Sequence, residues 1–523
     1  MPTPNPLYVE KMSPFMSRPG VQKDGTLLAS RFWTDSQHCR FQRGLPRKMG
    51  GYKELATNIT NVPRGTILVP NSPYFNVYVA QNNSTYPFSL EYLTIDQDGT
   101  VITSLGTIDR TPLTLAVNVN NDWQFDSMFS TTDDGSILIA FAAPNLDAID
   151  STVERDVFYG DSLATTRLIS TGHAVSGGIV VLHPYLFLFG NAGHVQWSAP
   201  NDPLTIQGDA RVSAEKVVAG IAVRGGNSSP AGLFWTLNNL IRCTFTGPPN
   251  DFTFDTISDE TSILSSSSVI EYDGLYFWVA IDRFCVYNGT VKEVPNDMVL
   301  NWFFDNLNFT WRQKVWATKV PRFGEIWWFF PFGDSIECNA AVVYNVRENT
   351  WYPTMLDRSC GIYNQVYQYP LWLGDTINKA GGYSVWEHEV GYDEVFIDNS
   401  TSPIDSYIQT SVVALPAYGP TGEFSGMDRW SEYYRYEPDL IQRGDMTLTV
   451  MGRQYANSPL TVGGTYPMLA NNSAVIPPIL ATTKIDIREQ YRQMLIKFES
   501  NVVGGYYEFG LNLNVFRVGD ARQ

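Results

Sequence analysis

Residues 273–289 read Asp-Gly-Leu-Tyr-Phe-Trp-Val-Ala-Ile-Asp-Arg-Phe-Cys-Val-Tyr-Asn-Gly and hold the clearest structural signal of the sequence. Two short apolar runs, Leu275–Val279 and Phe284–Tyr287, are bounded by the turn dipeptides Asp-Gly and Asn-Gly. Runs of β-branched and aromatic residues between such turns are typical of antiparallel strands in a meander. The pattern recurs at Ile326–Phe330 and Ala341–Tyr344, so the sequence predicts an all-β protein.

This unit repeats along the chain. We take one residue in the apolar strand of each unit as a marker. The first two markers are 61 residues apart, and later neighbouring markers are 43 to 51 residues apart. The markers are Val77, Leu138, Phe187, Phe234, Phe277, Trp328 and Trp372. Such gaps match the length of a four-stranded propeller blade, and radial packing of blades buries both faces of each sheet. We therefore predict a β-propeller of six or seven blades over residues 65–395. Stacked β-sandwiches are the alternative, because no strict blade motif recurs.

The two flanks of this region have a different pattern. Residues 1–64 are polar and interrupted by Pro and Gly, whereas residues 396–523 contain longer alternating runs such as Met494–Phe498. Alternation of apolar and polar residues is typical of half-buried strands. We predict that the C-terminal part forms a β-sandwich or β-barrel platform, which the N-terminal segment completes. Short helices are expected only near residues 295–304 and 486–492.

The composition narrows the class of protein. Charged residues make up only 17% of the 523 residues and aromatic residues 14%, which argues against helix bundles and favours large buried or shared surfaces. The 53 acidic and 36 basic side chains give a net charge of −17, which argues against a general basic grip on nucleic acid. Acidic walls repel phosphate, which suits a protein along which DNA must slide without sticking.

The cysteines and the hydropathy pattern bear on the compartment. The five cysteines show no C-x-x-C spacing, which predicts buried free thiols in a reducing compartment. They are Cys39, Cys243, Cys285, Cys338 and Cys360. No apolar run approaches the roughly 18 residues that a transmembrane helix needs, so no membrane span is expected.

Motifs for catalysis are missing from the sequence. It contains no G-x-S-x-G, no H-E-x-x-H, no P-loop and no G-x-G-x-x-G. The histidines are scattered without metal-ligand spacing; they are His38, His173, His183, His194 and His388. A partial sialidase-type Asp-box at residues 131–135 lacks its closing Trp. We predict no enzymatic activity, no cofactor and no metal site, although a hydrolase with paired carboxylates stays open as an alternative.

A basic segment stands out against the acidic whole. Arg40, Arg43, Arg47 and Lys48 place four bases within nine residues. They could contact DNA phosphates, dock on an acidic protein partner through bidentate arginine contacts, or form a solvated turn beside Gly50-Gly51. A partner interface is our working hypothesis for these four residues.

An acidic segment without Lys or Arg follows the predicted propeller strands. It contains Glu387, Glu389, Asp393, Glu394 and Asp398. Oxygen ligands of this kind could bind Ca²⁺, but the D-x-D-x-D-G order of a calcium loop is missing. A solvated loop is the preferred interpretation, and a segment that faces a channel is a further one.

Several short motifs resemble a known family. The stretch Arg40-Phe-Gln-Arg-Gly-Leu-Pro-Arg-Lys-Met-Gly-Gly51 resembles the pattern R-F-x-x-G-x-P-x-K-x-G-G of tail proteins from short-tailed bacteriophages. Val195–Pro203 is similar to their W-S-x-P-x-D-P strand, and Gly324–Pro331 and Trp386–Asp393 also match in style. The resemblance is to the tail nozzle, or packaged-DNA stabilisation, proteins of P22-like phages. It covers residues 30–518 as scattered motifs.

This resemblance implies a propeller joined to a β platform, with six copies in a ring beneath an adaptor or portal ring. It implies a virion protein of the tail, made in the bacterial host cytoplasm, with a tail needle or tailspike as neighbour. Such a ring would help retain packaged double-stranded DNA and pass it during ejection without specific binding. No catalytic residue comes with the family. A receptor-recognition propeller that binds or hydrolyses glycans is the alternative function.

Overall fold

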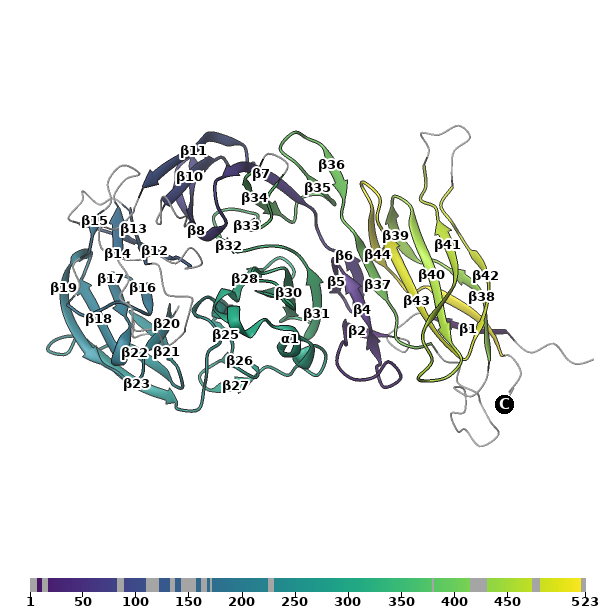
Figure 1. The fold of residues 1–523 in the computed structure, drawn as a ribbon, viewed down its shortest axis with the longest axis horizontal. Helices are drawn as coiled ribbons and strands as arrows, with labels where there is room; N and C mark the ends of the chain where they lie inside the picture. Colours follow the sequence, from purple (N-terminus) through teal and green to yellow (C-terminus); the bar gives the residue numbers. More distant parts are fainter. Residues whose placement is uncertain are drawn as a thin grey trace, which may run out of the picture.

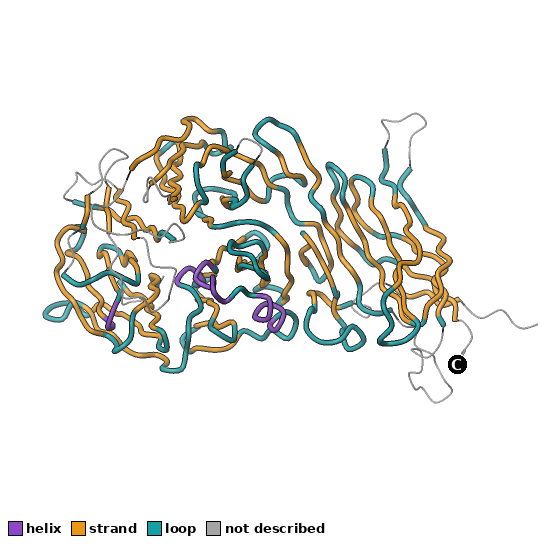
Figure 2. The backbone as a smooth tube through the Cα atoms, viewed as in Figure 1, coloured by secondary structure: helices purple, strands orange, loops and turns teal. Residues whose placement is uncertain are grey.

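The computed structural model describes residues 7–11, 17–81, 89–109, 122–131, 137–142, 157–160, 167–169, 172–223, 230–378, 381–413, 430–472 and 480–518. In these residues the chain builds two bodies that lie side by side, a ring of β-sheets and a stack of longer strands (Figure 1). Strands and loops make up almost all of both bodies, and the helical turns lie in the ring (Figure 2).

The ring is a β-propeller whose described strands form seven blades, each with a four-stranded antiparallel ladder (Figure 1). The first blade has β8 (Pro63–Asn71), β9 (Tyr74–Gln81), β10 (Ser89–Ile95) and β11 (Val101–Asp109), and the second has β12 (Gln124–Phe129), β13 (Ile137–Ala142), β14 (Val157–Gly160) and β15 (Arg167–Leu168). The third blade has β16 (Gly178–Leu182), β17 (Tyr185–Phe189), β18 (His194–Ala199) and β19 (Asp202–Arg211), and the fourth has β20 (Val217–Ala222), β21 (Ala231–Thr236), β22 (Leu240–Phe245) and β23 (Phe252–Ser258). The fifth blade has β24 (Ile270–Tyr272), β25 (Leu275–Val279), β26 (Phe284–Tyr287) and β27 (Val291–Glu293), and the sixth has β28 (Trp316–Val320), β29 (Glu325–Phe330), β30 (Ala340–Asn345) and β31 (Thr350–Met355). The seventh blade begins with β32 (Cys360–Ile362), β33 (Leu371–Leu373) and β34 (Tyr383–His388).

The blades close into a ring because the first strands of neighbouring blades meet around the axis. β32 of the seventh blade contacts β8 of the first. All seven residues that marked the sequence repeat, from Val77 to Trp372, lie on the second strand of their blade. The prediction of an all-β propeller with six or seven blades is therefore confirmed, with seven blades in the described residues.

The seventh blade takes its fourth strand from the other end of the chain. β7 (Tyr52–Ile59) pairs antiparallel with β34. β35 (Asp393–Val395) pairs parallel with β7, and β36 (Thr401–Pro403) extends the same sheet. The prediction that residues 1–64 lie wholly in the platform is wrong for β7, and the boundary at residue 395 falls inside this sheet. The physical reason is that β32, β33 and β34 leave one edge of the last blade unpaired.

One strand shows how neighbouring blades share their cores. β29 reads Glu-Ile-Trp-Trp-Phe-Phe, and all six of its residues are buried. Alternate side chains of a strand point to opposite faces. Trp328 accordingly packs toward the fifth blade, 5.1 Å from Phe284 between ring centroids, whereas Trp327 packs toward the seventh blade, 5.1 Å from Trp372. A strand with blades on both sides has no solvent-exposed face.

The platform contains three antiparallel sheets, in each of which the N-terminal strands lie at one edge beside C-terminal strands, and one two-stranded parallel sheet. Its N-terminal strands are β1 (Leu7–Lys11), β2 (Arg18–Val21), β3 (Phe32–Trp33), β4 (Asp35–Gln37), β5 (Cys39–Gln42) and β6 (Leu45–Lys48), of which β2 and β3 pair in parallel. Its C-terminal strands are β37 (Ser406–Gln409), β38 (Ser431–Glu437), β39 (Leu440–Arg443), β40 (Met446–Arg453), β41 (Thr461–Met468), β42 (Ile485–Tyr491), β43 (Gln493–Ser500), β44 (Tyr506–Phe509) and β45 (Leu513–Val518). The expected platform of N- and C-terminal segments is confirmed, because β1 pairs with β45, β4 with β37 and β6 with β44.

The platform docks on the sixth blade of the propeller. The last strand of that blade, β31, contacts β2 and β4 of the platform. One apolar core joins the two bodies, and it includes Trp327 and Phe329 from the propeller with Trp33, Phe41 and Phe498 from the platform. A shared core of large aromatic side chains fixes the platform against the ring through burial of apolar surface.

Four further expectations can be compared with the structure. The helix expected near residues 295–304 is present as α1 (Leu300–Asn306). The helix expected at 486–492 is wrong, because this segment is the strand β42, with Ile485 and Ile487 buried on one face. All five cysteines are free, and only Cys360 is partly exposed. Among the described residues, no helix is long and apolar enough to cross a membrane.

Candidate functional site

The basic segment forms the hairpin β5–β6 and lies where the platform meets the propeller. Arg40 is only 1% exposed. Its Nη1 and Nη2 donate to both oxygens of Glu389, at 2.7 and 2.5 Å, and its Nε lies 2.8 Å from Oε1 of Glu325. Its guanidinium also lies over the Phe323 ring, 3.8 Å from the centroid. Arg40 is therefore an internal link between the two bodies.

The buried carboxylate of Glu325 has further partners. Tyr352 donates its hydroxyl to Oε1 at 2.6 Å, and Trp327 donates its indole N–H to Oε2 at 3.0 Å. Burial raises the pKa of Glu325, and the Arg40 charge opposes this rise. Burial also opposes the charge on Arg40, but the two carboxylates together raise its pKa above the ordinary value. The charged pair therefore persists only because each partner neutralises the other.

The other three bases of the segment have different surroundings. Lys48 is buried and donates to the carbonyl of Ser500 at 3.3 Å, and burial lowers its pKa to about 8. Arg47 is partly exposed, with its Nη1 3.8 Å from Glu508. Arg43 is exposed. The prediction of a partner interface is thus wrong for Arg40 and Lys48, because both are buried inside the chain, and it stays a prediction for Arg43 and Arg47.

The acidic segment is also used inside the chain. Glu389 binds Arg40, and the carboxylate of Asp393 accepts two short contacts from the Gly504 N–H, at 2.9 and 2.8 Å. The hydroxyl of Tyr367 donates to Glu387. Asp398 accepts the N–H of Ser400 at 2.8 Å and so closes a turn. These contacts favour a structural role for this segment over a calcium loop.

A pocket of about 520 Å³ opens at the same junction, between the last two blades and the platform. It is lined by Tyr52 of β7, Trp386 of β34, Phe396, Asp357 and Arg358, among others. The Arg358 guanidinium lies 4.9 Å from the Tyr52 ring centroid and 5.3 Å from that of Trp386. Its Nη2 has no hydrogen-bond partner among the described residues. A buried cation held between aromatic rings is a potential anchor for a polar ligand.

Two neutral histidines border this pocket. Arg358 donates its Nε–H to Nε2 of His388 at 2.9 Å, so this nitrogen must carry a lone pair. Burial, with the Arg358 charge beside it, holds the pKa of His388 well below 6.5. Burial lowers the pKa of His38 to about 4. Both side chains are therefore uncharged at neutral pH.

We expect acid to destabilise the protein through these two histidines. Because their folded pKa values lie below 6.5, the unfolded chain binds more protons as the pH falls from 6.5 toward 4, and stability present above this window is lost within it. His38 should contribute on the order of 2 kcal/mol after solvent screening of its partly exposed ring. Urea unfolding at pH 7 and pH 5 measures the effect. The variant His388→Gln should reduce the pH dependence and the exposed control His183→Gln should not; an equal dependence in both variants would contradict the assignment.

A second cavity, of about 570 Å³, lies along the axis of the propeller and is lined by β12, β16, β20, β24 and β28. On its wall, Lys319 donates to Glu271 at 2.8 Å. Burial raises the pKa of Asp126 to about 6, although the N–H groups of Val181 and Ser127 donate to this carboxylate. The cavity is far too small for a DNA duplex. A DNA tube would therefore have to form between copies of the chain.

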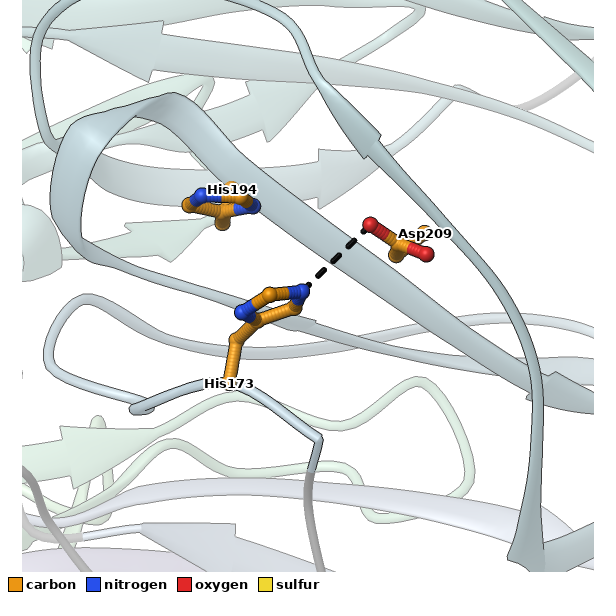
Figure 3. A group of neighbouring side chains, drawn as sticks. All are labelled: His173, His194 and Asp209. Atoms are coloured by element: carbon orange, nitrogen blue, oxygen red, sulfur yellow. Dashed lines mark ion pairs between the residues drawn. The ribbon is translucent and has the colours of Figure 1, made fainter.

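The structure also brings together three residues that sequence spacing did not connect. His173, His194 and Asp209 lie close to one another at the third blade (Figure 3). Their spacing in the sequence fits no metal-binding motif. The only sequence signal is that side chains alternate along a strand, which could have placed His194 of β18 and Asp209 of β19 on the same face of the sheet. Residues 132–135 of the partial Asp-box lie outside the described residues, so the box stays a prediction.

Comparisons with known proteins add little on function. No protein-family model matches the sequence, and no curated protein matches it. Among solved structures, a chain of the "Crystal Structure of Mitotic Checkpoint Complex" is similar, with 10% identity and a TM-score of 0.39 over 65% of this chain and 95% of that chain. So distant a likeness carries no argument, and the propeller assignment rests on the seven blades themselves.

Proposed function

We propose that the protein is a structural component of a short phage tail, a nozzle whose copies form a ring, with six as the expected number. The ring would extend the DNA exit channel below the adaptor or portal, help to retain packaged DNA and pass it during ejection. A tail needle or tailspike would be its distal neighbour. The proposal starts from the family resemblance of residues 30–518, and two features of the molecule support it.

The observation that carries most weight is the surface of the platform. Nine of the 20 exposed large apolar side chains of the described residues lie on this smaller body, and they include Ile441, Tyr455, Leu460, Val462, Leu480 and Val503. β41 lies at the edge of its five-stranded sheet, with no ladder partner on its outer side among the described residues. Long exposed edge strands mark surfaces that pair with another chain. The platform is therefore the surface on which we place contacts between copies.

The net charge is the second supporting feature. Six copies at −17 each would carry about −102 in one ring. Carboxylates that faced the lumen would repel DNA phosphates over about 8 to 10 Å at physiological salt. DNA could then move along the wall without adhering to it.

We expect assembly to depend on the platform edge. Val462 on β41 is 65% exposed, and Val462→Asp would place a charge in the proposed contact. The matched control Val366→Asp carries the same change in the propeller, at a residue that is 55% exposed. Light scattering and negative-stain imaging should show rings for the wild type and the control as concentration is raised, and monomers for Val462→Asp. Charge reversal at Arg43 and Arg47 tests docking to the adaptor in the same way.

The proposal has a clear contrary outcome. Wild-type protein that stays monomeric in the presence of its adaptor, or that binds double-stranded DNA saturably at physiological salt, would reject the nozzle function. Loss of rings in the Val366→Asp control would show that the effect is not specific to the platform.

The junction pocket supports a second candidate function, glycan binding. Its lining combines Trp386 and Tyr52 with the carboxylates of Asp357 and Glu394, the mixture of aromatic and acidic groups that sugar sites use. Beside it, burial and the nearby Asp357 raise the pKa of Asp375 to about 7. A glycan array with an assay for sugar release separates the two functions. Binding that is lost in Trp386→Ala would favour the glycan reading.

A further inference from the structure

His173, His194 and Asp209 form a cluster of potential metal ligands on the third blade (Figure 3). One ligand atom from each residue lies within 4.8 Å of the other two. The Nε2 atom of His173 is 3.4 Å from Oδ2 of Asp209, and the two imidazole rings stack with centroids 4.1 Å apart. In Figure 3 the two rings lie one above the other and the carboxylate lies to one side of both.

The sheet places two of the three ligands. Gln196 on β18 stands opposite Asp209 on β19, and His194 stands opposite Arg211. Residues paired across a ladder share a face, so His194 and Asp209 are diagonal neighbours on the same face of the blade. Arg211, also on this face, donates its Nε–H to the carbonyl of Ala192 at 2.9 Å. Two rigid strands thus fix the first two ligands.

The third ligand is held by a buried side chain. The Oε1 atom of Gln196 accepts the N–H groups of Gly172 and His173, at 3.0 and 3.2 Å, and its Nε2 donates to the carbonyl of His173 at 2.9 Å. Gln196 is itself buried. These three hydrogen bonds hold the backbone of His173 against β18, beside His194. They fix the backbone from which the His173 side chain projects toward the other two residues.

We propose that His173, His194 and Asp209 bind a divalent transition metal, with Zn²⁺ as the ion that fits best. Imidazole nitrogens disfavour Ca²⁺ and Mg²⁺, which take oxygen ligands, and two nitrogens with one carboxylate suit zinc. With bonds of about 2.0 to 2.1 Å, two ligand atoms of a tetrahedral zinc lie roughly 3.4 Å apart. The separation between Nε2 of His173 and Oδ2 of Asp209 has this value, and one of the two stacked imidazole rings must turn for both of their lone pairs to point at the same ion.

The surroundings leave the site open to solvent. The side chains of His173 and Asp209 are 42% and 55% exposed, so water can fill a fourth position. The Nδ1 atom of His194 is buried and has no hydrogen-bond partner among the described residues, so no such bond fixes its tautomer. The carboxylate of Asp209 attracts a divalent cation, whereas the positive charge of Arg211 on the same face opposes its binding.

The test is zinc binding by untagged, chelator-treated full-length protein. Competition with a chromophoric chelator should give one zinc per chain for the wild type, and zinc should raise its thermal midpoint because binding to the folded state stabilises it. Asp209→Asn, at an exposed position, and His194→Ala should each weaken binding by more than about tenfold and abolish the thermal shift. The control His183→Ala removes an exposed imidazole outside the cluster and should bind as the wild type does.

Cobalt(II) provides a second measurement, since its visible absorption is strong in tetrahedral sites and weak in octahedral ones. A strong band in the wild type that is lost in Asp209→Asn supports the proposal. Wild-type protein that binds no zinc at micromolar concentration, or variants that bind as tightly as the wild type, would overturn it. Circular dichroism of each variant confirms that the blade is folded, so weakened binding reports on the ligand set.

Discussion

Replacing Arg40 with alanine should cost the protein about 3 to 5 kcal/mol of stability, the usual effect of breaking a buried ion pair. The change would leave Glu325 and Glu389 without the cation that neutralises them, and Glu325 is completely buried. Arg40→Lys should recover only part of the loss, because an ammonium group cannot make the paired contacts of a guanidinium. Urea unfolding followed by tryptophan fluorescence measures the effect.

The control for this experiment lies in the same hairpin. Arg43→Ala removes an exposed guanidinium and should change stability by no more than about 0.5 kcal/mol. In a double-mutant cycle, Arg40→Ala and Glu325→Ala together should cost much less than the sum of the single changes. Additive single effects would show that the pair does not hold the platform against the propeller.

Leu55→Asp should open the seventh blade and destabilise the protein by at least about 4 kcal/mol. Leu55 on β7 is buried in a core with Leu373 and Val385 of the same blade. Truncation of a buried leucine alone costs about 2 to 5 kcal/mol, and a carboxylate in the same place adds the cost of burying a charge. Because β7 closes the ring, we expect the loss to reach the first blade, which β32 contacts.

Hydrogen exchange and thermal unfolding measure this loss. Exchange should rise in the amides of β34 and β8 before it rises in the platform strands. The control Thr401→Asp adds the same carboxylate at an exposed position on β36 of the same sheet and should leave the midpoint nearly unchanged. Protection that is equal in Leu55→Asp and the control would show that β7 is not needed for closure.

The blade repeat was predictable because its signal is local. Each blade needs a second strand that is buried on both faces, and such a strand appears as an uninterrupted apolar run such as Ile326–Phe330. Turn dipeptides bound these runs at nearly regular spacing. Local patterns of this kind do not depend on contacts with distant parts of the chain. The seven marker residues therefore lie on equivalent strands of the seven blades.

Closure of the ring was not predictable in the same way. β7 reads Tyr-Lys-Glu-Leu-Ala-Thr-Asn-Ile, which no local signal separates from the other strands of the N-terminal segment. Its partner β34 lies more than 300 residues away in the chain, as the pair Glu54 and Trp386 shows. Strand pairing over such a distance depends on which edges stay unpaired once the blades have packed.

The sequence by itself determined the fold class, the blade length and the acidic, aromatic-rich character of the chain, because these follow from composition and local periodicity. Only the tertiary structure decided that Arg40 and Lys48 are buried, since the partners of Arg40 lie 285 and 349 residues away. It also decided that His173, His194 and Asp209 meet, because strand register and a loop anchored by Gln196 bring them together. Charge and residue type set what a side chain can bind, but burial and register select its partner.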